Sequence, residues 1–349
     1  MITSLEIKNY KCFKDITLSN LSRINLFSGS NNVGKSAVLE AIWLNAGFFN
    51  PTLPLYIYGF RNWPKIQNYQ LMLDLFRGYN YDNKIGLKCK GESDLDCREH
   101  SIQAFDTDTP ISGNRSDSNS FDSVVRNEKE LRLETKIKNY DDLLKSKLSL
   151  KKGQLAGEAV KGRFPNSVFV TVKSQEFSDD EFDAFTHLTE EGKQELLIKS
   201  LQEFEPNLED IQIASTAGQK SFYVRVSYIK NRQFPINQLG SGIQHLLRCV
   251  FAIVRSQDGT VIIDEIENGI YHKNLGIIWE QLLILAEKFN VQIFASTHSY
   301  ECIREAHNAL KGKDALKVYR LDRPDSEIEA TEYDEKSLGA SLKFNMEIR

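Results

Sequence analysis

A glycine-rich segment near the start of the chain fits the pattern G-x-x-x-x-G-K-[ST] at every position: Gly29-Ser30-Asn31-Asn32-Val33-Gly34-Lys35-Ser36. Such a loop binds nucleotide phosphates, because its backbone N–H groups and its lysine donate hydrogen bonds to phosphate oxygens. A chance Gly-Lys-Ser turn is the alternative, but the elements predicted on either side of the loop argue against it. We expect Lys35 to act in catalysis, Ser36 to bind Mg²⁺, and ATP to be bound by Gly29, Asn31, Asn32, Gly34, Lys35, Ser36 and Ala37.

A pair of carboxylates, Asp264 and Glu265, follows the apolar run 260–263. We expect Asp264 to bind Mg²⁺, directly or through water, and Glu265 to orient and deprotonate the attacking water. Carboxylate pairs at strand ends are common in proteins where they have no catalytic role. The position of this pair, downstream of a phosphate-binding loop and a glycine-rich turn, favours the catalytic interpretation.

A histidine and that glycine-rich turn are further candidates for the same chemistry. His298 follows the apolar run 291–296. A lone histidine is more often structural, but its place in the strand after the acidic pair favours a functional role. The turn within 235–245 contains Ser241 and Gly242 and precedes a predicted helix. The N-terminus of that helix would attract a phosphate.

The phosphate-binding loop needs a strand before it and a helix after it, and the sequence predicts both. Residues 23–28 form a short apolar run that is typical of a buried strand. Residues 37–44 carry an apolar stripe that is typical of a helix, and Gly47 is predicted to end it. Residues 5–8 and 16–18 are predicted to be strands that pair nearby. An α/β fold follows.

The region after this helix is less regular. Residues 48–83 are rich in aromatic side chains, which indicate either base stacking or, as we favour, a small apolar subdomain that covers the sheet edge. The runs 84–90 and 131–138 alternate apolar and polar residues, so we expect two strands with one solvated face that pair with each other. Residues 105–123 are rich in Asp, Ser, Asn and Thr, and we expect a mobile surface loop there.

Residues 126–163 are the most basic stretch of the chain, with eleven Lys and Arg against six Asp and Glu. A DNA-facing patch is one interpretation, and a solvated strand face is the favoured one. The net charge of −4 gives no general attraction to nucleic acid. Any contact with DNA would therefore need a local basic patch.

The second half of the chain is predicted to alternate strands and helices. The predicted elements are a strand at 167–172, two helices within 179–204 separated near Gly192, strands at 208–214 and 222–229, and, after His298, one helix and a strand at 317–321. No heptad repeat is visible, so a long coiled coil is not expected.

The composition, with 41% hydrophobic and 26% charged residues, is typical of a soluble globular protein. No apolar run reaches about 18 residues, so we expect no membrane contact. The N-terminal residues do not form a signal peptide. The five cysteines are scattered and form no C-x-x-C pair, which argues against a zinc site or a disulfide framework. We expect a cytoplasmic protein.

The motifs, in this order, resemble those of the ABC-type ATPases of the OLD (overcoming lysogenisation defect) and RecF-like group. The resemblance rests on the segments IKNYKCF, GSNNVGKS, LGSGIQ, VIIDEIENGIYH and QIFASTHS, and it extends over nearly the whole chain. It implies a P-loop NTPase fold of ABC-ATPase type, with a mixed central sheet, an antiparallel β subdomain and a helical subdomain. The implied ligands are ATP and Mg²⁺.

The resemblance also implies roles for single residues. His298 would lie beside the γ-phosphate, while Ser241 and Gly242 would contact the γ-phosphate of a nucleotide held by another protomer. The signature turn reads LGSGI in place of the usual LSGGQ. Either the Ser241 hydroxyl or backbone N–H groups would therefore make that contact. The glutamine of the group's Q-loop stays open among Gln67, Gln70 and Gln103.

We expect a single ABC-type ATPase domain over residues 1–349. Its predicted parts are a phosphate-binding lobe at 1–47, an inserted aromatic and antiparallel β region at 48–165, a helical and signature region at 166–259, and a region at 260–349 that holds the acidic strand, His298 and a last strand and helix. The 51 residues after His298 carry no Toprim nuclease pattern. We therefore expect an ATPase without its own nuclease.

The leading functional hypothesis is a switch in which two protomers, or a higher homo-oligomer, close over ATP and open on hydrolysis. The resemblance implies a separately encoded effector, a nuclease, and a role in bacterial anti-phage defence. The alternative is a RecF-like DNA-binding ATPase in repair or recombination. A scaffold that binds ATP with negligible turnover is a third hypothesis, but the acidic pair and His298 argue against it.

Overall fold

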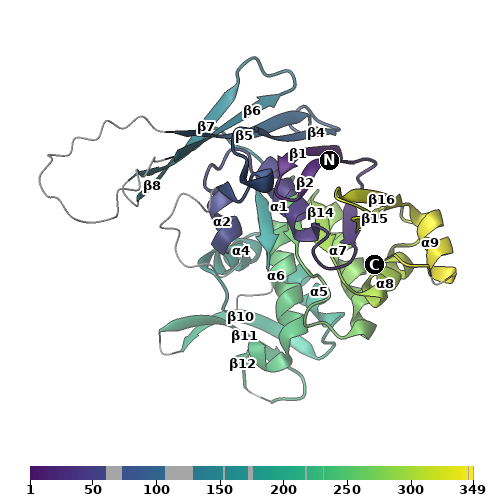
Figure 1. Ribbon diagram of the computed structural model, residues 1–349. Coiled ribbons are helices and arrows are strands. Elements are labelled where there is room, and N and C mark those ends of the chain that lie inside the picture. The colour runs from purple at the N-terminus through teal and green to yellow at the C-terminus, as the bar shows by residue number, and fades with distance from the viewer. Residues whose placement is uncertain are drawn as a thin grey trace, which may run out of the picture.

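Two sheets face each other across helix α1 (Lys35–Ala46), and a smaller third sheet lies with the helices of the lower part of the molecule (Figure 1). The structure is a computed structural model. It describes residues 1–59, 73–106, 129–151, 154–171, 176–216, 218–230, 232–344 and 346–348. The predicted α/β class, with a mixed sheet, an antiparallel sheet and a helical part, is confirmed.

The central sheet has the strand order β16-β15-β3-β14-β13-β9. Its strands are β3 (Ile24–Ser28), β9 (Ser167–Val170), β13 (Thr260–Ile263), β14 (Gln292–Ser296), β15 (Leu316–Asp322) and β16 (Glu329–Tyr333). All neighbours are parallel except β16, which is antiparallel to β15. The carboxyl ends of β3, β14, β13 and β9 therefore meet at one edge.

Alternate residues of the central strands enter two different hydrophobic cores. Ile24 and Leu26 of β3 pack into the core shared with the lower helices, while Phe27 packs into the core around α1. The same alternation places Ile262 of β13 and Phe294 of β14 against α1. Burial on both faces explains why these strands read as continuous apolar runs. Helix α1 is itself buried on nearly all sides, so the predicted single apolar stripe is wrong.

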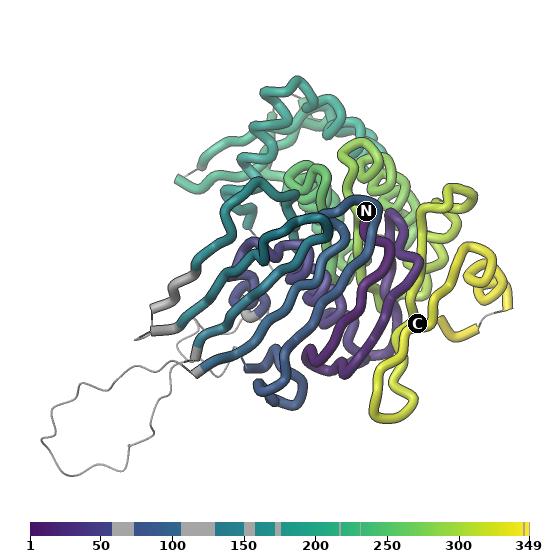
Figure 2. Tube along the Cα trace, turned by 90° about the horizontal axis from the view of Figure 1, so that it is seen from above, coloured from purple at the N-terminus to yellow at the C-terminus, as the bar shows by residue number. Residues whose placement is uncertain are grey.

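The antiparallel sheet has the order β2-β1-β4-β5-β6-β7-β8, and Figure 2 shows its strands side by side. Its strands are β1 (Ile2–Tyr10), β2 (Phe13–Leu18), β4 (Ile85–Gly91), β5 (Arg98–Asp106), β6 (Lys129–Ile137), β7 (Leu144–Lys151) and β8 (Gln154–Glu158). Strands from the predicted lobe 1–47 and from the predicted insertion 48–165 thus share one sheet. Residues 107–123 of the predicted mobile loop lie outside the described residues.

The predicted pairing of the runs 84–90 and 131–138 is wrong, because β5 lies between β4 and β6. The sequence hides β5, since two of its core-facing residues are polar. Arg98 and His100 are 7% and 1% exposed. Arg98 donates to the Asn45 carbonyl (3.0 Å), and His100 Nδ1 lies 2.8 Å from the Thr135 hydroxyl. These partners come from elsewhere in the chain, so an alternation of apolar residues never appears.

The helices below the central sheet include those predicted on either side of Gly192. They are α4 (Asp179–Glu190), α5 (Gln194–Gln202), α6 (Ser241–Arg255), α7 (Leu275–Lys288) and α8 (Tyr300–Leu310), with α9 (Glu335–Lys343) near the chain end and a short α2 (Leu53–Gly59) beside α1. The third sheet consists of β10 (Leu208–Thr216), β11 (Gln219–Val226) and β12 (Phe234–Pro235). Strand β16 and helix α9 were not predicted. No helix among the described ranges has the length and apolar character needed to cross a membrane.

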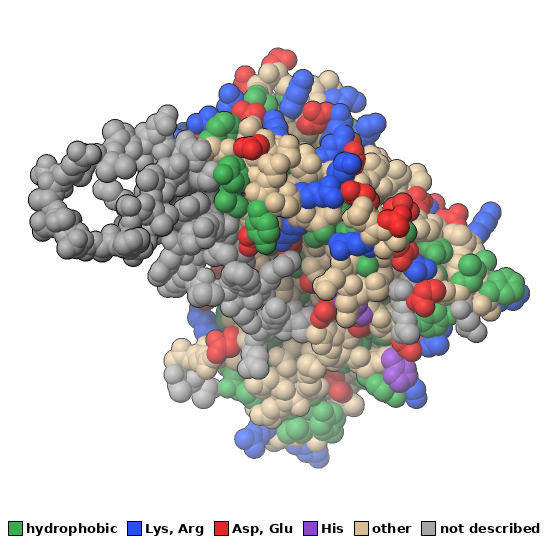
Figure 3. All heavy atoms as spheres, viewed as in Figure 1, with side chains coloured by type: hydrophobic (Ala, Val, Ile, Leu, Met, Phe, Trp, Pro, Cys, Tyr) green, Lys and Arg blue, Asp and Glu red, His purple; other side chains and the backbone are tan. Residues whose placement is uncertain are grey.

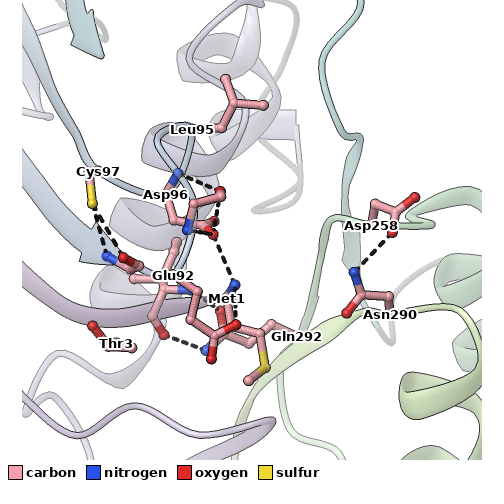
Figure 4. A network of polar contacts seen from close by, with 12 residues as sticks. Met1, Thr3, Glu92, Leu95, Asp96, Cys97, Asp258, Asn290 and Gln292 are labelled. Atoms are coloured by element: carbon pink, nitrogen blue, oxygen red, sulfur yellow. Dashed lines mark hydrogen bonds and ion pairs between the residues drawn. The ribbon is translucent and has the colours of Figure 1, made fainter. Parts of the chain in front are cut away.

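A polar network fixes the start of β1 at the opposite edge of the central sheet (Figure 4). The Met1 amine donates to Glu92 (3.2 Å) and Asp96 (2.9 Å), both from the loop between β4 and β5. Burial works against the charge of Asp96, but bonds from the Met1 amine and Ser93 lower the pKa of its carboxyl. Gln292, the first residue of β14, accepts from the Ile2 N–H (2.9 Å) and donates to its carbonyl (2.8 Å). The antiparallel and central sheets are thereby held in register.

Candidate active site

The candidate site lies at the edge where β3, β13 and β14 end, because parallel strands bring their carboxyl ends together. The phosphate-binding loop follows β3, the acidic pair follows β13, and His298 comes two residues after β14. The sequence predicted that these residues belong to one site. We call five of them the edge site: Lys35, Ser36, Asp264, Glu265 and His298.

The loop between β3 and α1 has the backbone that its glycines allow. Gly29 and Gly34 have φ angles of 131° and 95°. A Cβ on Gly29 would lie 2.3 Å from the Leu321 carbonyl oxygen, and one on Gly34 would lie 2.8 Å from the Phe13 ring. Both positions therefore require glycine. Helix α1 begins directly after Gly34, so its first N–H groups are free to bind an anion.

The remaining predicted loop residues differ in exposure. Asn31 and Asn32 are exposed at the tip of the loop, and Asn32 has a φ of 63°. Ala37 is buried in the first turn of α1, at 6% exposure. Ala37 can therefore address a phosphate only through its backbone N–H.

Lys35 is buried and bonded to its own loop. Its ammonium donates to the carbonyls of Gly29 (2.6 Å) and Ser30 (2.7 Å). Burial lowers the pKa of Lys35, and the charges of Asp264, Glu267 and Glu265 oppose that shift. A buried cation close to an anion-binding loop gains most from a phosphate, because that anion restores the stabilisation that water would give.

A chain of hydrogen bonds joins the ends of all three strands. The Ser36 hydroxyl donates to Asp264, at 3.2 Å from Oδ2, and the Ser296 hydroxyl donates to Asp264 Oδ1. The Ser296 oxygen in turn accepts from the Glu265 N–H at 2.9 Å. Glu265 has a φ of 52°, a left-handed conformation that costs a non-glycine residue free energy. Strain of this kind is typical of functional sites.

His298 and Glu265 face each other across the open side of the site. His298 Nε2 lies 3.8 Å from Glu265 Oε1, and their side chains are 40% and 48% exposed. The His298 N–H donates to Glu267 Oε1 at 2.7 Å. The sequence predicted His298 but gave no role to the Glu267 carboxylate. The edge site is thus fixed at its base and open to solvent at its mouth.

The structure places the signature turn on the loop that follows Glu265. Gly240 precedes α6 with a φ of 104°, and the Ser241 hydroxyl donates to the Gly269 carbonyl at 3.2 Å. A Cβ on Gly242 would lie 2.8 Å from the Phe204 ring and 3.0 Å from the Gly269 oxygen. No contact among the described residues joins Ser241 or Gly242 to the phosphate-binding loop of the same chain.

The donor set of the edge site fits Mg²⁺. Ser36 offers a hydroxyl and Asp264 a carboxylate, and their oxygens lie 3.2 and 3.4 Å apart. Mg²⁺ prefers such hard oxygen ligands and is commonly held by one or two carboxylates together with substrate phosphates. The described part of the chain contains no group of three or more His, Cys, Asp or Glu that could hold a metal. A triphosphate on the loop would supply the further oxygens.

The topology redirects the search for the Q-loop glutamine. β9 is the strand beside β13, and the Asp264 N–H donates to the Val170 carbonyl at the end of β9. Gln103 lies on β5 in the other sheet, while Gln67 and Gln70 lie outside the described residues. The first glutamine after β9 is Gln175, also outside those residues. A buried strand followed within a few residues by glutamine was the signal that could have identified it.

Comparisons with known proteins agree with this geometry. A family model described as AAA ATPase domain matches residues 1–152 and 99–303. An ATP/GTP phosphatase of Helicobacter pylori is 22% identical over an alignment of 381 residues, covering 99% of this chain and 98% of that protein. The uncharacterized protein MJECL10 of Methanocaldococcus jannaschii is 43% identical over 44 residues, 13% of this chain and 20% of that protein.

The likeness among solved structures concerns the fold. A crystal structure of an Smc head bound to the C-terminal winged-helix domain of ScpA has a TM-score of 0.51 and 13% identity, covering 95% of this chain and 98% of that one. This likeness confirms the predicted fold of a P-loop ATPase of ABC type.

Proposed function

This chain belongs to the AAA ATPase domain family and is an ATPase, and we propose that it hydrolyses ATP with Mg²⁺ at the edge site. The observation that carries this proposal is the hydrogen-bonded chain from Ser36 through Asp264 and Ser296 to Glu265. It joins the phosphate-binding loop to the carboxylate that would act on water. The OLD-like assignment within the family rests on the resemblance of the motifs.

The proposed chemistry divides the work among the side chains. Lys35 leaves its carbonyl partners and binds the β- and γ-phosphates, while Ser36 and Asp264 hold Mg²⁺, which neutralises phosphate charge. Glu265 orients the attacking water and takes its proton as the water oxygen bonds to the γ-phosphorus and the bond to the ADP oxygen breaks. His298, opposite Glu265, donates a hydrogen bond to the γ-phosphate.

The proposed working form is a homodimer, or a higher homo-oligomer, closed over ATP. The half-exposed Glu265 and His298 support this proposal, because a water nucleophile must be held away from bulk solvent. Ser241 is exposed at the N-terminus of α6, beside the same open side of the loop after Glu265. In a second copy, Ser241 and Gly242 would present this helix N-terminus to the γ-phosphate.

Closure that depends on the γ-phosphate makes the protein a switch, since hydrolysis removes the group that favours the closed state. We propose that the switch controls a separately encoded effector, a nuclease, in anti-phage defence in the cytoplasm. This part of the proposal rests on the resemblance to the OLD and RecF-like group.

Glu265→Gln tests the site and the dimer together. We expect phosphate release to fall about 10³-fold, because Gln keeps the shape but cannot accept the proton. ATP should remain bound, and light scattering should detect dimers that accumulate with ATP but not with ADP. The exposed Glu280 of α7 offers a matched control, since Glu280→Gln should leave turnover unchanged. Undiminished hydrolysis in the Glu265 variant would remove this residue from the mechanism, and a monomer with ATP would remove the composite site.

A further inference from the structure

Glu267 is a third carboxylate of the acidic loop, and the reaction proposed above does not use it. Its Oε1 accepts the backbone N–H of His298 at 2.7 Å. Its Oε2 is buried and has no hydrogen-bond partner among the described residues. A buried carboxylate oxygen without a donor costs free energy, so this arrangement calls for an explanation.

Three hydrogen bonds connect the loop after β13 to the end of β14. The Glu265 N–H donates to the Ser296 hydroxyl (2.9 Å), and the Ile266 N–H donates to the Ser296 carbonyl (3.1 Å). The third bond, from the His298 N–H to Glu267, is the one that reaches the residue with the imidazole. The first two fix Glu265, and the third fixes His298 relative to it.

We propose that Glu267 is a positioning residue for ATP hydrolysis, which holds the backbone of His298 so that the imidazole faces Glu265. The proposal rests on the roles given above to Glu265 and His298. A charged acceptor forms a shorter and stronger bond to an N–H than a neutral one does. His298 lies just beyond the last residue of β14, where no ladder bond holds its N–H. The carboxylate replaces that missing bond.

Loss of the Glu267 acceptor should therefore act on the chemical step. Without it the His298 N–H has no partner, and the imidazole is free to move from its place 3.8 Å from Glu265. A displacement of about 1 Å at a reacting centre can reduce a rate about 100-fold. The phosphate-binding loop belongs to another strand end and would keep its own contacts.

The first experiment compares Glu267→Met, which removes the acceptor, with Glu267→Gln, which keeps an amide oxygen at the same place. Glu280→Met is the matched control on an exposed helix position. We expect kcat to fall about 100-fold in Glu267→Met, with KM for ATP within about threefold of the unmodified chain, and to recover at least about tenfold in Glu267→Gln. Unchanged kcat in Glu267→Met, or equal loss in both variants, would overturn the proposal.

A second measurement follows the hydrogen bond itself and does not depend on turnover. The chain has six histidines, so selective ¹⁵N-histidine labelling gives a simple amide spectrum in which a His298→Gln variant identifies the His298 peak. The His298 amide proton should shift upfield in Glu267→Met and stay near its position in Glu267→Gln and Glu280→Met. An unmoved peak in Glu267→Met would overturn the proposal even if that variant had lost activity.

The two sets of variants separate this inference from the function on which it rests. If Glu265→Gln hydrolyses ATP normally, the proposed function fails, whatever the Glu267 variants do. If Glu265→Gln is inactive and Glu267→Met is fully active, the function stands and the positioning role fails. Both results are read on the full chain with the same phosphate-release assay.

Discussion

The edge site and the outer face of the antiparallel sheet both gather charged side chains, but their charges have different partners. At the edge site, Asp264 accepts from hydroxyls and Glu267 accepts from a peptide N–H. On the outer face, glutamates of one strand pair with lysines of the next. These pairs are Lys84–Glu134 (3.8 Å), Lys88–Glu99 and Lys147–Glu158 (3.1 Å).

The difference shows which charges are still available to a ligand. Figure 3 shows Lys and Arg interspersed with Asp and Glu over the upper part of the molecule, where the antiparallel sheet lies in Figure 1. Exposed pairs of this kind neutralise one another and contribute little to stability, because water and salt screen them. At the edge site the carboxylates face only neutral groups and the buried Lys35. A metal ion and a phosphate would satisfy both signs there.

The largest effect expected from this comparison is that of Lys35→Met. The substitution removes the buried cation from the phosphate-binding loop, and we expect phosphate release to fall about 10³-fold. Lys145→Met is the matched control, because Lys145 is an exposed lysine of β7 on the outer face. Its turnover should equal that of the unmodified chain. Similar losses in the two variants would mean that the edge site is not distinguished from the outer face.

The next effect concerns stability and compares a buried ion pair with an exposed one. Arg248 of α6 donates to both carboxylate oxygens of Glu181, at 3.0 and 3.2 Å, and to the Glu176 carbonyl. Their side chains are only 10% and 11% exposed. Arg248→Met leaves a buried carboxylate without its cation, so we expect the free energy of unfolding to fall by about 3 kcal/mol.

Urea unfolding followed by circular dichroism measures this change. Lys88→Met removes one partner of the exposed Lys88–Glu99 pair and should leave the urea midpoint within experimental error. An Arg248 variant as stable as the Lys88 variant would show that burial of the first pair has no consequence for folding. Because α6 begins at the signature turn, the same unfolding curve reports on the helix that carries Ser241.

The edge site could be predicted from sequence because each part leaves a local signal. The glycines at 29 and 34, the acidic pair and His298 each follow a short apolar run, and parallel strands must bring such ends together. The predicted strands and the helices around Gly192 were confirmed for the same reason, since their patterns lie within single segments.

The parts that could not be predicted depend on contacts between distant segments. β5 was missed because Arg98 and His100 are buried by partners on α1 and β6. The Q-loop glutamine was sought in the wrong region, because only the sheet order shows that β9 lies beside β13. Glu267 was recorded only as part of a family motif, since its bond to His298 crosses from one strand end to another.

The smallest effect is expected from charge reversal on the outer face, and it decides between the two functional hypotheses. Lys145 and Lys147 lie on β7, and Lys147 already pairs with Glu158. If the chain is an ATP-driven switch, Lys145→Glu with Lys147→Glu should leave phosphate release unchanged, with and without DNA. A RecF-like DNA-binding ATPase that used this face would lose DNA affinity, and its plot of log K against log salt would become shallower by about two phosphate contacts. Fluorescence anisotropy with a labelled duplex at several salt concentrations measures that slope. Since the lysines of this face are largely matched by glutamates, we expect the slope to stay the same.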